Sequence, residues 1–145
     1  MVDREKLSFG VTLIELLIVI SIVTLLFSII LVSTMNARNT ARDARIQVSL
    51  DQIRSIAEKY RLDHGNYDNF FVGDISYSLL RQDIVDMGGI PNSSTASDKS
   101  GYCIYSKMNN GKYCCVDNKF VYKCYDTEPS VCGSGCEAAN NCACE

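Results

Sequence analysis

One uninterrupted apolar run near the N-terminus limits what this chain can fold into. From Val11 to Val32 the residues are apolar apart from one acid, Glu15, and a few hydroxyl side chains, and the run contains no Gly, Pro, Lys or Arg. At a rise of ~1.5 Å per residue, a helix of this length can cross the hydrocarbon core of a bilayer. The run is too long for the apolar part of a cleaved secretory signal, and no small-x-small site follows it. The sequence therefore predicts a membrane-spanning helix over residues 11–33.

A carboxylate inside such a run is costly unless it has a partner or reaches the interface. A short polar leader, residues 1–10, precedes the run and ends in Gly10, and Val11-Thr12-Leu13-Ile14-Glu15 follows it. This pattern resembles the N-terminal segment of type IV pilins and type II secretion pseudopilins, and the resemblance covers roughly residues 8–65. Thr24 and Val32 depart from it, since many members carry Gly and Pro there, and Val11 replaces the usual Phe.

The resemblance implies a role for three residues. A prepilin peptidase in the membrane would cut after Gly10, and Val11 would become a methylated N-terminus. Glu15 would pair with the N-terminal amine of a neighbouring subunit and set its register in a filament. Two alternatives remain open: an uncleaved anchor in which Gly10 is a joint, and an acid that reaches the nearby interface by snorkelling. The stripe of Ser21, Thr24 and Ser28 could allow close helix packing, or these hydroxyls could bond to their own backbone.

The run continues into an amphipathic segment, residues 34–64. Apolar side chains recur at spacings of four, three, four and three, which is one stripe of an α-helix; they are Ile46, Leu50, Ile53, Ala57 and Tyr60. Gly65 can adopt the left-handed conformation that ends a helix. We therefore expect one helix from residue 11 to about 63, with a hinge near Ser33–Asn36 as the alternative.

Residues 65–145 are expected to form a small head. A short helix would be capped by Ser76 and stopped by Gly88-Gly89, with an apolar side of Leu79, Leu80, Ile84 and Met87. A polar surface loop would follow at Asn92–Ser100. Three short strands then alternate with turn residues, Asn110-Gly111 and Asp117-Asn118, and predict an antiparallel meander; these strands are Tyr102–Lys107, Lys112–Val116 and Phe120–Tyr125.

All eight cysteines lie in the last 43 residues: Cys103, Cys114, Cys115, Cys124, Cys132, Cys136, Cys142 and Cys144. An even number in a small non-cytosolic module indicates a disulfide framework. Because disulfides persist outside the cytosol, this framework also places the C-terminal part there. A metal site is the alternative, but there is no Cys-x-x-Cys pair, and the single histidine, His64, is distant in sequence.

The pairing of the cysteines is not determined by the sequence. Neighbours in a strand point to opposite faces, so Cys114 and Cys115 should have different partners. We also expect at least one bridge from the sheet cysteines to the tail cysteines, which begin at Cys132.

The sequence thus predicts an α+β, pilin-like fold: a long N-terminal transmembrane-plus-amphipathic helix packed on a three-stranded antiparallel sheet, with a disulfide-rich C-terminal tail. No catalytic set or cofactor motif is evident, so we expect a structural protein rather than an enzyme. Residues 65–145 carry six basic and ten acidic side chains, and this acidic balance argues against direct nucleic-acid binding.

The function expected from the resemblance is that of a filament subunit. The chain would be a single-pass inner-membrane protein until assembly and would then join an extracellular filament. Its partners would be copies of itself, the membrane, the prepilin peptidase, an assembly ATPase and a platform protein. Three alternatives remain: a type II secretion pseudopilin, a membrane-anchored binding module that does not polymerise, and a Cys-rich metal carrier.

Overall fold

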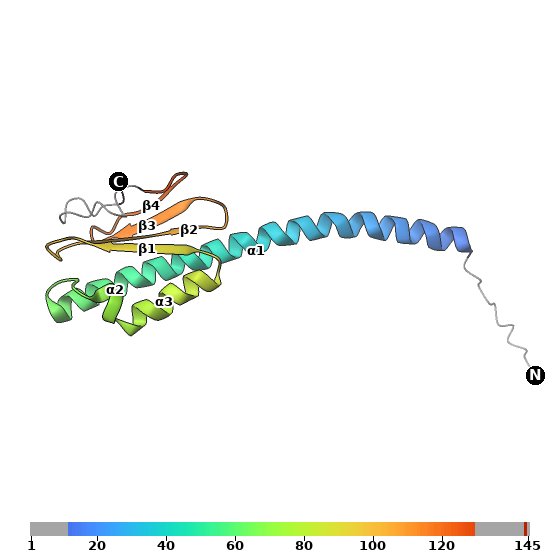
Figure 1. The fold of residues 1–145 in the computed structure, drawn as a ribbon. Coiled ribbons are helices and arrows are strands. Elements are labelled where there is room, and N and C mark those ends of the chain that lie inside the picture. Colours follow the sequence, from blue (N-terminus) through green and yellow to red (C-terminus); the bar gives the residue numbers. More distant parts are fainter. Residues whose placement is uncertain (1–11, 130–143, 145) are drawn as a thin grey trace, which may run out of the picture. The chain divides into compact units, whose positions relative to one another are not determined.

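The structure is a computed structural model that describes residues 12–129 and 144 of the chain (Figure 1). It divides into two compact units, one up to Ala37 and one from Arg38 on. The elements are α1 (Leu13–His64), α2 (Phe70–Gly73), α3 (Ile75–Asp86), β1 (Ile90–Thr95), β2 (Tyr102–Lys107), β3 (Tyr113–Asp117) and β4 (Tyr122–Tyr125).

Helix α1 is continuous over 52 residues. The prediction of one helix is therefore confirmed, and the alternative of a hinge near Ser33–Asn36 is wrong, because Ser and Asn are weak helix breakers. The helix ends as predicted at Gly65, which has φ 81° and donates its backbone N–H to the carbonyl oxygen of Arg61 at 2.7 Å. This is the left-handed glycine cap.

The second half of α1 provides one side of the head's core. Ile46, Leu50, Ile53 and Ala57 are completely buried, and Tyr60 packs against their cluster. The predicted stripe is thus confirmed. In the unit from Arg38 on, α1 and α3 lie along one face of the sheet (Figure 1). Complete burial of a large apolar side chain stabilises a fold by ~1.5–3 kcal/mol. The burial of these four side chains therefore fixes this part of α1 to the sheet.

The sheet has four antiparallel strands in the order β1-β2-β3-β4. Three of them were predicted within two residues at either end, but the count of three was wrong. Strand β1 covers Ile90–Thr95, part of which was expected to be a loop at Asn92–Ser100. Its sequence has no apolar alternation, because it is an edge strand that pairs with β2 through its backbone and buries little besides Pro91. Proline is tolerated at such an edge.

Helix α3 also differs from the prediction at its start. Asp74, not Ser76, is the N-cap: its side chain accepts the backbone N–H of Tyr77 at 2.9 Å. The helix therefore begins earlier and presents Tyr77 and Ile84 to the core, whereas Leu79 is 67% exposed. The expectation that Leu79 lies on the buried side was wrong, since the large ring of Tyr77 takes that place.

Candidate functional site

The start of α1 is a capping box formed by Thr12 and Glu15. Oε2 of Glu15 accepts the backbone N–H of Thr12 at 2.9 Å and its hydroxyl at 2.8 Å. In return, the backbone N–H of Glu15 approaches the Thr12 hydroxyl oxygen at 3.3 Å. These bonds satisfy donors that every helix N-terminus leaves unpaired. They also hold the Glu15 carboxylate beside the backbone of Thr12.

The other two N-terminal site residues, Gly10 and Val11, lie outside the residues that the structure describes. Cleavage after Gly10 and the pairing of Glu15 with an amine therefore remain predictions. What the geometry provides is a carboxylate fixed at the helix start by one of its oxygens. Its other oxygen, Oε1, accepts no hydrogen bond from the residues that the structure describes.

The apolar side chains that follow Glu15 are all open to the surroundings. From Leu13 to Leu31 the large apolar side chains are 52–82% exposed. An 18-residue window of α1 has a mean hydropathy of 3.0, so by length and composition this helix can cross a membrane. Exposed apolar surface on this scale requires lipid or other protein around it.

Three hydroxyls in this segment bond to their own helix. Ser21, Thr24 and Ser28 donate to the backbone carbonyls four residues earlier, at 2.8, 2.6 and 2.9 Å. Local bonding is thus observed in the single chain, and close packing of this stripe against another helix stays a prediction. With their donors satisfied internally, these side chains are tolerated in an apolar environment.

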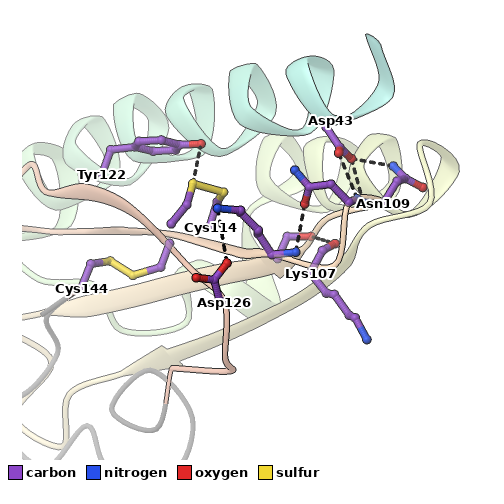
Figure 2. Close-up of a disulfide and its surroundings, with 12 residues drawn as sticks. Asp43, Lys107, Asn109, Cys114, Tyr122, Asp126 and Cys144 are labelled. Carbon is purple, nitrogen blue, oxygen red and sulfur yellow. Dashed lines mark hydrogen bonds and ion pairs between the residues drawn. A yellow bond between two sulfur atoms is a disulfide. The ribbon is translucent and has the colours of Figure 1, made fainter. Parts of the chain in front are cut away.

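A buried acid that the sequence analysis did not identify joins α1 to the sheet (Figure 2). Asp43 is only 5% exposed. Its Oδ1 accepts the backbone and side-chain N–H groups of Asn109 at 2.7 and 2.8 Å, and its Oδ2 accepts the N–H of Asn110 at 3.1 Å. Because both carboxylate oxygens are used, Asp43 fixes the β2–β3 turn to the helix.

Two disulfides are present among the described residues, Cys114–Cys124 and Cys115–Cys144 (Figure 2). The neighbours Cys114 and Cys115 therefore have different partners, as expected from their opposite orientation. Cys114 lies in the core shared with α1, and Cys115 lies in a second cluster on the other face. The bridge to Cys144 is the expected link from sheet to tail.

The remaining tail cysteines, Cys132, Cys136 and Cys142, lie outside the described residues. Cys103 has its Sγ 3.9 Å from that of Cys115. The sulfurs of Cys103, Cys115 and Cys144 all lie within 4.8 Å of one another. A metal centre would need thiolates, but Cys115 and Cys144 are bonded to each other and Cys103 is also disulfide-bonded, so none of the three is a thiolate. The arrangement therefore fits a cross-link.

A second buried acid, Asp117, organises the chain next to that cross-link. Its Oδ1 accepts the backbone N–H groups of Lys119 and Val121 at 2.9 and 3.0 Å, and its Oδ2 accepts that of Cys144 at 2.9 Å. The side chain thus holds both the turn after β3 and the residue that closes the Cys115–Cys144 bridge. Because of this turn, β4 begins at Tyr122 rather than at the predicted Phe120.

His64, the single histidine, lies at the end of α1. Its ring stacks on that of Tyr60 with centroids 4.1 Å apart, and its Nδ1 lies 3.1 Å from the Tyr60 carbonyl oxygen. His64 thus closes the end of α1 and is not one of the three residues whose ligand atoms gather at Cys103, Cys115 and Cys144.

A long apolar N-terminal helix that continues into a small antiparallel sheet with disulfides defines a pilin-like α+β protein. Among characterised proteins, the chain is similar to the type IV wide pilus major component PilA4 of Thermus thermophilus. The two are 28% identical over 116 residues, which cover 79% of this chain and 86% of that protein. This similarity confirms the predicted resemblance to the type IV pilin family. No family model matches the chain, and no solved structure matches it.

Proposed function

We propose that this chain is a structural subunit of a type IV pilus or a related filament. The observation that carries the proposal is the exposed apolar segment of α1, opened by the Thr12–Glu15 capping box, in a chain similar to a major pilus component. Lipid can cover that segment before assembly, and the same segments of other subunits can cover it afterwards. A structural protein of this kind needs no cofactor.

The proposed route begins with cleavage between Gly10 and Val11 by a prepilin peptidase. The new amine of Val11 then lies four residues before Glu15, at the membrane boundary. Opposite charges attract strongly where water is excluded, so an incoming subunit would place its amine against the Glu15 carboxylate of a neighbour. The capping box supports this step, since it holds the carboxylate at the helix start through one of its oxygens.

The remaining partners follow from the pilin resemblance. An assembly ATPase and a platform protein would extract subunits from the inner membrane, with the disulfide-bonded head outside the cytosol. The finished filament would be extracellular. The acidic balance of residues 65–145 keeps direct nucleic-acid binding outside the proposal.

The first test is the N-terminal residue and intact mass of the protein recovered from its native membrane. A chain that begins at Val11 and carries one methyl group's extra mass is expected. A chain that still begins at Met1, in cells that contain the processing enzyme, would contradict the proposal and favour the anchored module that does not polymerise.

The second test separates the charge of Glu15 from its capping bonds. Glu15→Gln keeps an oxygen that can accept the Thr12 N–H but removes the charge. We expect it to insert normally and to lower filament yield by about tenfold or more, as for loss of one partner of a buried charge pair. Ser21→Ala is the matched control, because in the described part of the chain that hydroxyl donates to the Leu17 carbonyl of its own helix. Normal filaments from Glu15→Gln would show that pairing with an amine is not required.

A further inference from the structure

Three arginines follow the apolar run on one face of α1. Arg38, Arg42 and Arg45 lie four and then three residues apart on this helix, and all three are exposed. Residues at these spacings are neighbours on a helix surface, where like charges repel each other. The cluster therefore destabilises the helix unless anions lie close to it.

Among the described residues, Arg45 is the member of this cluster that has an anionic partner. It pairs with Asp83 at 2.7 Å. The adjacent acid Asp43 is not available to the others, because both of its carboxylate oxygens accept N–H groups of the β2–β3 turn (Figure 2). Arg38 and Arg42 take part in none of the ion pairs and hydrogen bonds of the described part of the chain. Their anion therefore has to come from outside it.

The two unpaired arginines come directly after the membrane-spanning segment. Arg38 and Arg42 follow Val32, the end of the apolar run, by six and ten residues, which in a helix is a rise of ~9 and ~15 Å. Side chains on a helix point back toward its N-terminus by roughly one turn, ~5 Å. The headgroup layer extends about 5–8 Å beyond the hydrocarbon core. With the edge of that core at Val32, both guanidinium groups reach the headgroups, whereas Arg45, at ~20 Å, does not.

The position of these arginines carries a cost in the proposed orientation. Basic residues close to a membrane span favour the cytosolic side, and with the head outside the cytosol Arg38 and Arg42 lie on the opposite side. The other flank of the span offers only Arg4 and Lys6 between the start of the chain and Gly10. A favourable contact at the outer surface of the membrane would offset this cost.

Phosphate is the anion that this place and these side chains fit. A guanidinium group binds a phosphate through two parallel N–H bonds, and anionic lipid surfaces attract basic residues next to a membrane helix. Residues 65–145 carry six basic and ten acidic side chains, so the attraction is confined to this part of α1. We propose that Arg38 and Arg42 bind the phosphate groups of anionic phospholipids in the outer leaflet and so hold α1 at a fixed depth before assembly. This inference rests on the membrane-spanning part of the proposed function and does not require polymerisation.

The direct test measures which lipids the full chain retains. The chain is reconstituted in bilayers of equal amounts of phosphatidylglycerol and phosphatidylcholine, and the lipids that stay bound on release are counted by native mass spectrometry. The unsubstituted chain should retain phosphatidylglycerol in preference. Arg38→Gln with Arg42→Gln should lower the ratio of the two retained lipids by about fivefold for each arginine removed. An unchanged ratio would overturn the proposal.

The matched control removes the same charge elsewhere. Lys59 and Arg81 are exposed on α1 and α3, and Lys59 lies 21 residues beyond Arg38. Lys59→Gln with Arg81→Gln should leave the lipid ratio as it is in the unsubstituted chain. An equal fall in both double variants would mean that the net charge alone governs the preference, and it would overturn the proposed contact.

Filament yield separates this inference from the proposed function and from a contact between copies. Because the lipids stay behind on assembly, Arg38→Gln with Arg42→Gln should lower the lipid ratio and still give filaments. Lost filaments with an unchanged lipid ratio would assign the two arginines to a neighbouring copy and overturn the proposal. If the unsubstituted chain retains phosphatidylglycerol but forms no filaments with the complete assembly machinery, the proposed function fails and the lipid contact stands.

Discussion

Arg45 on α1 binds Asp83 on α3 through two of its nitrogens. Nε and Nη2 of Arg45 lie 3.0 and 2.7 Å from Oδ1 of Asp83. Ser49, one turn further along α1, donates its hydroxyl to Oδ2 at 2.8 Å. The hydrogen bonds from Arg45, and then that from Ser49, lower the pKa of Asp83 below its usual value. This pair thus links the two helices of the head in a pH-dependent way.

The first prediction concerns acid stability. Because the pKa of Asp83 is lower in the folded than in the unfolded chain, its contribution is present above the unfolded pKa, about 3.9, and is lost as the pH falls through the folded pKa. Asp83→Asn should lower the melting temperature at pH 7. It should also reduce the drop in melting temperature between about pH 5 and pH 2. Near-ultraviolet circular dichroism of the full chain in detergent measures this.

The control for that experiment is Asp86→Asn. Asp86 lies one turn from Asp83 on α3, and within the described part of the chain its carboxylate accepts only from Gln82 on the same helix, at 2.8 Å. The melting temperature of the Asp86→Asn variant should change with pH as that of the unsubstituted chain does. An Asp83→Asn variant with an acid transition as steep as the parent's would show that the Arg45 pair does not govern acid stability.

The second prediction concerns the buried acid Asp43. Asp43→Ala leaves three N–H groups of Asn109 and Asn110 without their acceptor and should reduce the free energy of unfolding by about 2–4 kcal/mol. Asp43→Asn keeps one acceptor oxygen and should lose about half as much. Urea unfolding of the full chain in detergent gives both values. Asp63→Asn, on the exposed end of α1, should change little, and equal losses from Asp43→Ala and Asp63→Asn would contradict the role of Asp43.

The sequence predicts those features of the fold that depend on local pattern. The buried stripe from Ile46 to Ala57 follows from helical periodicity, and β2 follows from alternation and the turn at Asn110-Gly111. Gly65 ends α1 because it can adopt the left-handed backbone conformation, which is a property of that residue alone. Each of these predictions depends on residues that are close together in the chain.

The parts that were missed depend on distant partners or on the backbone alone. Asp43 acts through Asn109, 66 residues away, and its own neighbours are the basic and polar residues of a solvated helix face. Strand β1 is formed by backbone pairing to β2, so its side chains carry no strand signal. Asp74 and Ser76 are both good caps. The cap is Asp74 because the helix that begins there buries the ring of Tyr77.

The third prediction compares glycines with positive φ. Gly65 and Gly111 have φ 81° and 87° with no atom within 4 Å of an added Cβ, so alanine at either site should cost about 1–2 kcal/mol from the backbone alone. An added Cβ at Gly88, with φ 88°, would lie 2.6 Å from Oδ1 of Asn109, the residue that Asp43 holds. Gly88→Ala should therefore cost about 2–4 kcal/mol. Denaturant unfolding compares the three variants, and equal losses would show that the Gly88 contact relaxes freely.

The last prediction ranks the two disulfides by the chain that each encloses. Cys114 and Cys124 are 10 residues apart, and Cys115 and Cys144 are 29 apart. By loop entropy, removing the shorter bridge costs about 2.7 kcal/mol and the longer about 3.6 kcal/mol. Double alanine variants of each pair avoid a free thiol next to Cys103. Urea unfolding, with the remaining bridges checked by mass spectrometry, should show the larger loss for Cys115→Ala with Cys144→Ala. The reverse order would mean that burial of Cys114 against α1 outweighs the entropy of the longer loop.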